Sequence, residues 1–333
     1  MNKRVKILIP SIGLWVLSPT FISLTSAVAK AQGTTAAPHT AELIKLSLIV
    51  TDQANHSVDE VRKEDILVID EGVPQIVSFI ARDNRPVNYA LVIDNSGSFR
   101  DVLTPAVKAA KLIVESNRPE DETFIERFIN SKKVEVVQEF TSEKQFLTSG
   151  LDTLYVEGGK SAVIDALYLA TDHTAKYRSG DNSHRRAVIV FTDCEERASW
   201  YSDKQLFKLI RTNNIQVFVV GITYLLNKDR GLIRSSPREK AERLARRLAE
   251  ESGGRVFFPK NEKELIAAVN QIIHDLHAQF LVGYERQGKS SEKDQRQVKV
   301  TIAGSEKLTA IAPAAYEVGT TSSAQKENAN KAP

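Results

Sequence analysis

The sequence predicts an α/β protein whose doubly wound, mostly parallel sheet is covered by helices on both faces. Nearly continuous apolar runs, such as Val87–Ile93 and Ala187–Thr192, suit strands that are buried on both sides. Segments with helical periodicity separate such runs, as Arg238–Glu251 separates Ile215–Gly221 from Arg255–Phe258. Strands that alternate with helices along a chain are typical of parallel sheets, so the order of the segments indicates this fold class.

Composition and charge exclude several classes of protein. The chain has 333 residues, 42% hydrophobic and 26% charged, which is incompatible with a collagen-like, coiled-coil or fully disordered protein. The first 31 residues carry four basic side chains and no acid, so their removal takes the formal net charge from +3 to −1. A near-neutral chain favours no nucleic-acid partner. The single cysteine, Cys194, excludes an intramolecular disulfide and a cysteine-based zinc cluster.

The N-terminal segment, residues 1–31, has the features of a signal peptide. A positive stretch at Lys3–Lys6 precedes a largely apolar run at Ile7–Val28, and Ala29–Ala31 fits a cleavage site. An uncleaved membrane anchor is the alternative, against which Pro10 and Pro19 count. No cysteine lies near the cleavage site, so a lipid-anchored protein is excluded. We expect an exported protein, periplasmic or extracellular, that touches a membrane only through this segment if it is uncleaved.

Changes in composition and periodicity divide the rest of the chain. We expect a linker at 32–40, an N-terminal β unit at 41–85, a main α/β domain at 86–277, a C-terminal β segment at 278–317 and a disordered tail at 318–333. Each β segment is short for an independent core. We therefore expect the two β segments to pair with each other, with the main domain inserted between them.

The expected elements follow from local periodicity and helix caps. Short alternating strands are predicted before and after the main domain, at Leu43–Thr51, Asp65–Asp70, Gln75–Ala81, Gln279–Tyr284, Gln297–Ile302 and Lys307–Ile311. Further strands are predicted at Thr123–Ile129, Val134–Phe140, Ile215–Gly221 and Arg255–Phe258, and helices at Leu103–Val114, Ser161–Ala175, Asp203–Arg211 and from Asn261. Ser142 is expected to cap a short helix.

Oxygen-bearing side chains follow the predicted strands at the edge where ligands bind in open parallel sheets. Asp94-Asn95-Ser96-Gly97-Ser98 comes directly after Val87–Ile93, and Asp193 comes directly after Ala187–Thr192. Ser161 begins the helix between them. Carboxylate and hydroxyl oxygens are ligands for hard divalent cations. The sequence therefore predicts one metal site made by Asp94, Ser96, Ser98, Ser161 and Asp193.

This pattern resembles the von Willebrand factor type A domain with its metal-ion-dependent adhesion site. That family has Asp-x-Ser-x-Ser on the first loop, a Thr on the second and an Asp on the third. Asp94, Ser96 and Ser98 match the first element, Asp193 matches the last, and Ser161 replaces the Thr. The resemblance covers about residues 86–277. The segments Glu71–Gln75, Gly253–Pro259 and Gln279–Tyr284 resemble those of an exported bacterial subgroup of this family.

The resemblance implies a non-enzymatic binding or adhesion protein. Its site would hold Mg²⁺, or Mn²⁺ or Ca²⁺, and an acidic side chain of a protein partner would complete the coordination of the cation. Two positions depart from the family pattern. Ser161 keeps the hydroxyl of the Thr without its methyl group, and Cys194 stands where the family usually has Gly after the last Asp.

Other functions fit the sequence less well. A structural assembly subunit with a vestigial metal site is one alternative. A phosphohydrolase using Asp94 would need a second Asp where Ser96 stands, and a phosphate-binding loop ending at Lys160-Ser161 would need Gly where Leu154 stands. Cys194 is expected to be inert. His274 and His277 are expected on an exposed helix face rather than as metal ligands.

Overall fold

A computed structural model describes residues 42–226, 235–286, 295–304 and 307–317. The predicted signal peptide at 1–31, the linker at 32–40 and the tail at 318–333 lie outside the described residues, and the domain boundaries stay predictions. No helix within these described ranges is both long and apolar enough to cross a membrane.

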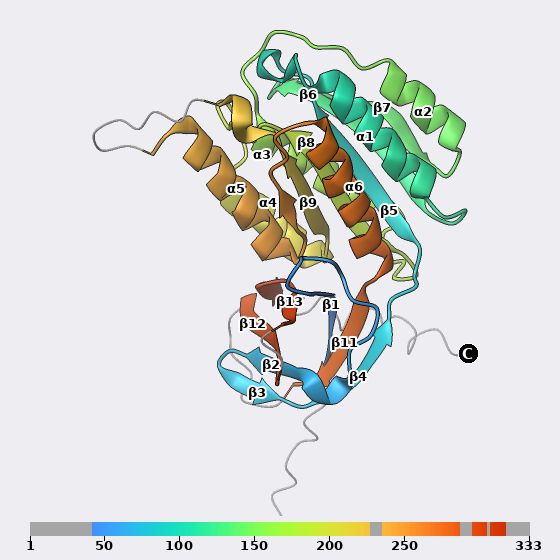
Figure 1. The fold of residues 1–333 in the computed structure, drawn as a ribbon, viewed down its shortest axis with the longest axis vertical. Helices are drawn as coiled ribbons and strands as arrows, with labels where there is room; N and C mark the ends of the chain where they lie inside the picture. The colour runs from blue at the N-terminus through green and yellow to red at the C-terminus, as the bar shows by residue number, and fades with distance from the viewer. Residues whose placement is uncertain (1–41, 227–234, 287–294, 305–306, 318–333) are drawn as a thin grey trace, which may run out of the picture. The chain divides into compact units, whose positions relative to one another are not determined.

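A six-stranded sheet forms the centre of the main domain (Figure 1), in the order β10-β9-β8-β5-β6-β7. Neighbouring strands are parallel, except that β7 runs antiparallel to β6. The predicted fold class is therefore confirmed. The strands are β5 (Val87–Asp94), β6 (Glu122–Asn130), β7 (Lys133–Thr141), β8 (Arg185–Thr192), β9 (Gln216–Gly221) and β10 (Val256–Phe257).

Helices cover both faces of this sheet. Because side chains alternate along a strand, β5 sends Leu91 and Ile93 into one core and Ala90 and Val92 into the other. The first core is closed by α1 (Leu103–Ser116), α2 (Lys144–Asp152) and α6 (Glu262–His277), and the second by α3 (Val163–Lys176), α4 (Asp203–Asn213) and α5 (Pro237–Ser252). Single turns of 3-10 helix occur at η1 (Lys63–Asp65), η2 (Gly97–Phe99) and η3 (Thr223–Leu225).

Of two helix caps indicated by the sequence, one forms as predicted and the other does not. Asn261 caps α6, since its side chain accepts a hydrogen bond from the Glu264 backbone N–H at 2.9 Å. The prediction that Ser142 caps the short helix is wrong. Strand β7 extends to Thr141, and α2 begins only at Lys144, after Glu143, so Ser142 lies too early to reach the free N–H groups of the helix.

The two flanking β segments pair with each other, as predicted. Strand β1 (Leu43–Thr51) lies antiparallel to β11 (Phe280–Glu285), and β2 (Ile66–Asp70) lies antiparallel to β12 (Gln295–Ile302). With β3 (Val73–Gln75), β4 (Val77–Arg82), β13 (Thr309–Ile311) and β14 (Ala315–Glu317), they form two four-stranded sheets, β13-β1-β11-β4 and β14-β12-β2-β3. Strand β14 was not predicted.

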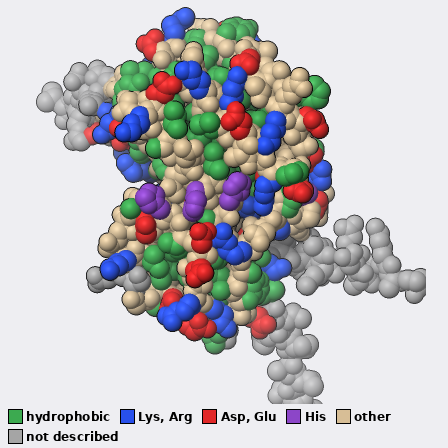
Figure 2. Space-filling view, turned by 45° about the vertical axis from the view of Figure 1, so that its right-hand side comes forward, with side chains coloured by type: hydrophobic (Ala, Val, Ile, Leu, Met, Phe, Trp, Pro, Cys, Tyr) green, Lys and Arg blue, Asp and Glu red, His purple; other side chains and the backbone are tan. Residues whose placement is uncertain are grey.

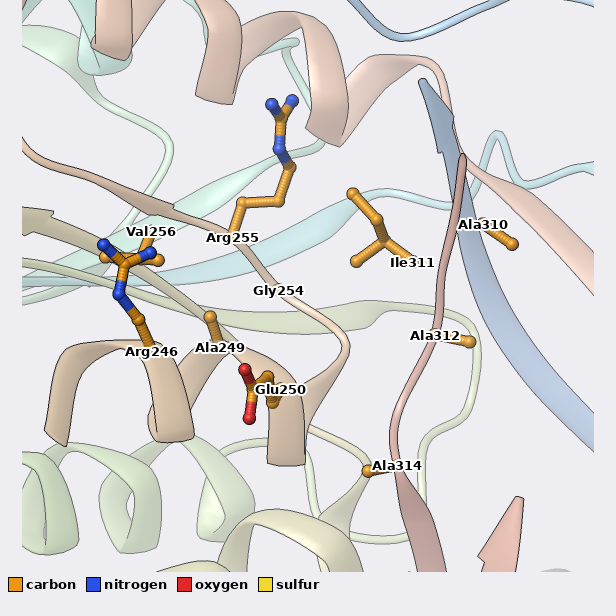
Figure 3. Close-up of a pocket in the computed structure, with 10 residues that line it drawn as sticks. All are labelled: Arg246, Ala249, Glu250, Gly254, Arg255, Val256, Ala310, Ile311, Ala312 and Ala314. Carbon is orange, nitrogen blue, oxygen red and sulfur yellow. The ribbon is translucent and has the colours of Figure 1, made fainter. Parts of the chain in front are cut away.

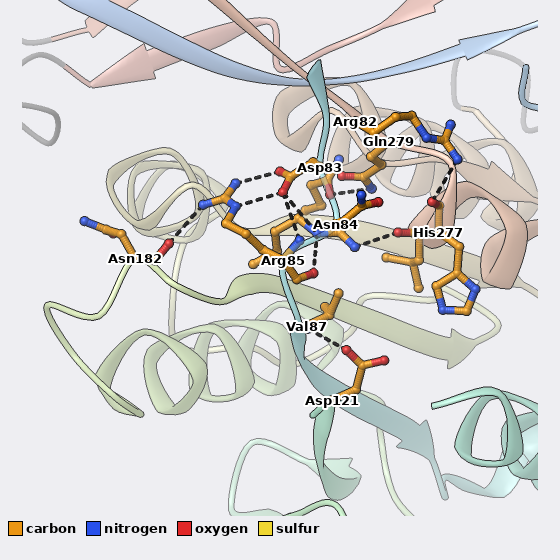
Figure 4. A network of polar contacts seen from close by, with 12 residues as sticks. Arg82, Asp83, Asn84, Arg85, Val87, Asp121, Asn182, His277 and Gln279 are labelled. Carbon is orange, nitrogen blue, oxygen red and sulfur yellow. Dashed lines mark hydrogen bonds and ion pairs between the residues drawn. The ribbon is translucent and has the colours of Figure 1, made fainter. Parts of the chain in front are cut away.

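Polar contacts join the segments by which the chain enters and leaves the main domain (Figure 4). The Asp83 N–H donates to the Gln279 carbonyl at 2.9 Å, and Arg82 Nη2 donates to the His277 carbonyl at 3.4 Å. Burial opposes ionisation of Asp83, but its bonds to Arg85 hold the pKa of the carboxyl below its usual value. Entry and exit are thus held side by side at the amino ends of the parallel strands.

Asp70 joins three strands of the β unit, and this arrangement generates a stability prediction. Its buried Oδ2 accepts hydrogen bonds from the Tyr284 hydroxyl at 2.8 Å and the Tyr316 hydroxyl at 2.7 Å. We expect Tyr284→Phe to lower the free energy of unfolding by about 1.5–3 kcal/mol, since a bond to a charged group is lost. Urea unfolding followed by circular dichroism measures this change.

Tyr168→Phe is the matched control, because no hydrogen bond of the Tyr168 hydroxyl is found in the described part of the chain. Its ring stacks on Tyr201, and the substitution leaves that stack in place. If both substitutions lowered the free energy of unfolding equally, the stabilising hydrogen bond assigned to Asp70 and Tyr284 would be contradicted.

Candidate metal centre

The predicted ligands lie on loops that meet at the carboxyl edge of the central sheet. Strand β5 ends at Asp94, and the neighbouring parallel strand β8 ends at Thr192, directly before Asp193. Because Ile93 is in register with Phe191, these two strands end at the same level. The third loop leads from α2 to Ser161, at the start of α3.

Asp94 is the point on which these loops converge. Its side chain is fully buried, and its Oδ1 accepts a hydrogen bond from the Ser96 backbone N–H at 2.9 Å. Its Oδ2 accepts hydrogen bonds from the Thr192 hydroxyl at 2.8 Å and from the Ser161 hydroxyl at 3.4 Å. The Ser96 and Ser98 hydroxyl oxygens lie 3.2 Å apart. The structure thus brings Ser96 and Ser161 to Asp94, with Ser98 against Ser96.

Asp193 supplies the second buried carboxylate. Its Oδ1 accepts a hydrogen bond from the Glu195 N–H at 2.8 Å, whereas its buried Oδ2 has no hydrogen-bond partner among the described residues. Burial raises the pKa of Asp193, an effect that hydrogen bonding to Ser98 opposes. Burial and, second, the charge of Asp193 raise the pKa of Asp94 to about 7. The five predicted side chains therefore share one electrostatic site.

The charge and chemistry of this cluster fit a hard divalent cation. Two buried carboxylates repel each other, and within the described ranges neither forms an ion pair with Lys or Arg. The polar atoms are oxygens, and Asp193 Oδ2 is a buried acceptor without a donor. No group of three or more His, Cys, Asp or Glu side chains suited to a metal occurs among the described residues, so hydroxyls would have to complete the ligand set.

Residues that the sequence analysis did not single out hold the loops together. The Asn95 side chain donates to the Tyr155 carbonyl at 2.7 Å, and the Glu157 N–H donates to the Asn95 carbonyl at 2.9 Å. Thr192 anchors Asp94, as described above. The register of β5 and β8 places the Thr192 hydroxyl beside Asp94. A correct prediction of how these two strands pair could therefore have identified Thr192 as a residue of the site.

The loop that follows Asp193 is ordered by two carboxylates. Glu196 accepts hydrogen bonds from the backbone N–H groups of Ile164 and Ser199 at 3.0 and 2.9 Å. Asp165 accepts them from the N–H groups of Trp200 and Tyr201, both at 2.8 Å. These contacts fix the loop to the first turns of α3, next to Ser161.

Cys194 and the histidines lie outside the ligand set. Cys194 is buried with a left-handed φ of +59°, a conformation that favours the Gly expected there, and burial raises the pKa of its thiol. An inert Cys194 agrees with this environment. His274 is exposed as expected, but the expectation for His277 is wrong, because its position at the end of α6 leaves it half-buried. Burial lowers the pKa of His277.

A pocket of about 400 Å³ lies away from this centre, between α5, β10 and the segment that carries β13 (Figure 3). Its wall is mostly small and apolar. Of its two arginines, Arg255 is paired with Asp275 at 2.8 Å, and Arg246 lies 4.8 Å from the centroid of the Phe258 ring. The described residues that line it form no cluster of free polar groups that would indicate a ligand.

The raised pKa of Asp94 generates a prediction for the metal-free protein. In the folded state Asp94 keeps its proton up to about pH 7, whereas in the unfolded chain it loses the proton near pH 4. Between these values the folded state binds more protons, so stability falls as the pH rises. We expect the thermal midpoint in EDTA to fall between pH 5 and 7.5, and Asp94→Asn to remove part of this fall. Calorimetry measures both.

Asp152→Asn is the control, because Asp152 is an exposed carboxylate on α2, paired only with Lys111 among the described residues. This variant should keep the pH dependence of the parent protein. A pH dependence that Asp94→Asn leaves unchanged would show that Asp94 does not titrate as described.

Comparisons with known proteins identify the domain. Residues 89–196 match the family described as von Willebrand factor type A domain. No curated protein matches the chain. Among solved structures, an aerotolerance-related membrane protein from Bacteroides fragilis is 20% identical, covering 56% of this chain and 98% of that chain with a TM-score of 0.41.

A von Willebrand factor type A protein from Catenulispora acidiphila is 10% identical, covering 85% of this chain and 76% of that one, with a TM-score of 0.47. The PilB minor pilin from Streptococcus sanguinis is 10% identical, with coverages of 60% and 63% and a TM-score of 0.43. Structural similarity of this degree carries no inference about function. The family match, in contrast, spans all five predicted ligands, and the chain is a protein with a von Willebrand factor type A domain.

Proposed function

We propose that the chain is an exported, non-enzymatic binding or adhesion protein that binds an acidic side chain of a protein partner through a divalent cation. The domain family is typical of binding and adhesion proteins. The observation that carries the proposal is the convergence of two buried carboxylates and three hydroxyls, with Asp193 Oδ2 left without a donor. Asp94, Ser96, Ser98, Ser161 and Asp193 would hold the cation, which is Mg²⁺ or else Mn²⁺ or Ca²⁺.

When bound, the cation supplies a positive charge with an exchangeable coordination position for a carboxylate. The protein residues prepare this position. Thr192 and the Ser96 N–H orient the Asp94 carboxylate, and the serines add oxygen without adding negative charge. With only two carboxylates in the set, a bound divalent cation leaves the site without net negative charge, so the site does not repel a further acidic ligand.

Binding fits these residues better than hydrolysis does. The Ser96 hydroxyl contacts the Ser98 hydroxyl, and no general acid stands beside Asp94 at the position where a phosphohydrolase would need one. Acidic and basic side chains are interspersed over the face shown in Figure 2, without a continuous basic patch, which supports a protein rather than a nucleic-acid partner. Export rests on the features of residues 1–31, and the site of action is the periplasm or the exterior.

Mg²⁺ itself tests this function. We expect Mg²⁺ at about 100 times its Kd to stabilise the EDTA-treated protein at pH 7.5 by about 2.7 kcal/mol, which corresponds to a thermal midpoint higher by about 5 °C or more. Asp94→Asn should abolish the shift, because the mutation removes one of the two carboxylates. Asp152→Asn, on the exposed face of α2, should retain it.

Identical Mg²⁺ responses in the parent protein and Asp94→Asn would contradict the proposal and favour the assembly subunit with a vestigial site. Hydrolysis of phosphate esters that is lost in Asp94→Asn would instead favour the phosphohydrolase.

A further inference from the structure

Exposed aromatic side chains stand on the loops that surround the candidate metal centre. Trp200 is 82% exposed, more than any other large apolar side chain in the described part of the molecule. Tyr155 is 53% exposed and Tyr224 is 36% exposed. We call these three residues the aromatic rim. Aromatic side chains left in solvent beside a binding site are typical anchors of protein interfaces.

The first member of the rim, Tyr155, is held beside Asp94. Its carbonyl accepts the hydrogen bond from the Asn95 side chain at 2.7 Å, and Asn95 directly follows Asp94. The Arg127 guanidinium lies 4.5 Å from the centroid of the Tyr155 ring, and its Nη2 donates to the Tyr155 hydroxyl at 3.3 Å. The ring is therefore oriented in advance, although half of it faces solvent.

Trp200 stands on the loop that begins with Asp193. Its N–H donates to both carboxylate oxygens of Asp165, at 2.8 and 2.9 Å, and the ring of the next residue, Tyr201, stacks on Tyr168 at 3.7 Å. The backbone is thus fixed on both sides of an indole that makes no ring contact with the other described residues. A rigid loop that presents a free indole loses little conformational entropy on binding.

Tyr224 completes the rim from the end of β9. Residue Ile222, two positions earlier, donates its N–H to the Thr192 carbonyl at 2.8 Å. Thr192 also hydrogen-bonds to Asp94, so this third loop is tied to the same centre.

The charges around the rim indicate the charge of the occupant. Lys160 precedes Ser161, Arg100 follows Ser98 by two positions, and Lys132 lies in the turn between β6 and β7. All three side chains are exposed, and none has an ion-pair partner in the ranges that the structure describes. One exposed acid, Asp101, accompanies them in these turns, and the partly exposed Glu157 in the loop of Lys160 forms an ion pair with Lys133. The surface therefore complements an acidic ligand that also carries apolar groups.

We propose that the aromatic rim selects the partner, which is a polypeptide segment whose Asp or Glu is flanked by bulky apolar side chains. The acidic side chain reaches the cation, and the flanking side chains pack on Trp200, Tyr155 and Tyr224. This inference rests on the proposed function and adds a partner class to it.

Two defined peptides test the inference on the full chain. The probes are acetylated, amidated Gly-Phe-Glu-Phe-Gly and Gly-Gly-Glu-Gly-Gly, titrated in Mg²⁺ or in EDTA. Trp15→Phe leaves Trp200 as the one tryptophan of the sequence, so the fluorescence of Trp200 reports binding at the rim. For variants that lack Trp200, calorimetry measures the binding of the peptides. We expect the Phe-containing peptide to bind at least tenfold more tightly, and only in Mg²⁺.

Trp200→Ala and Tyr155→Ala should each reduce this preference by about threefold or more. Stabilisation by Mg²⁺ and binding of the Gly-rich peptide should stay unchanged. Phe146→Ala is the matched control, since Phe146 is 59% exposed on α2, near the opposite edge of the sheet. It should leave the preference intact.

The possible failures are distinguishable. If Mg²⁺ stabilises the protein but the two peptides bind with equal affinity, or neither binds, the role of the aromatic rim in selecting the partner is overturned. The proposal that the site binds a cation then still stands. Absence of Mg²⁺ stabilisation overturns the proposed function as well. An oligosaccharide of uronic acids that binds more tightly than either peptide, and depends on Trp200, overturns the polypeptide partner.

Discussion

The rest of the candidate site depends on two carboxylates that are buried together at the ends of neighbouring parallel strands. Burial and mutual repulsion raise the pKa of Asp94, and Asp193 keeps one oxygen without a donor. No basic side chain in the described ranges forms an ion pair with either of them. A cluster of this kind is unfavourable until protons or a cation neutralise it. The fold therefore holds negative charge where the family pattern expects a metal.

The surrounding loops keep this charge in place by many ordinary hydrogen bonds. Asn95 ties the first loop to the second, and the Arg197 N–H ties the third to the Ser161 carbonyl at 3.0 Å. Asp165 and Glu196, which are carboxylates of the same region, are occupied by backbone N–H groups. Carboxylates near the centre thus divide into those that order the protein and those that remain available for a ligand.

Because the main domain is inserted into the β unit, the β unit lies at the amino ends of the parallel strands, away from the candidate metal centre. The chain enters at Val87 and leaves after His277, both at the amino ends of the parallel strands. The contacts of Asp83 and Arg82 hold these connections together, and β1, β11, β2 and β12 close the β unit around them. Among the described residues, the carboxyl edge carries loops of the main domain, so the candidate centre lies at the opposite end of the strands from the β unit.

The sequence by itself predicted most of the strands and helices and the loops that carry Asp94, Ser161 and Asp193, because apolar periodicity and strand-end position are local properties. It also predicted the pairing of the flanking segments, because each is short for an independent core, but it did not predict β14. Only the tertiary structure decided the register of β5 on β8, and this register adds Thr192 to the site. It also decided that His277 is half-buried and that Trp200 is exposed. It also decided that β7 ends at Thr141, which leaves Ser142 without a capping role. These features depend on contacts between residues far apart in the chain, such as Thr192 with Asp94, and no local pattern records which distant side chains will meet.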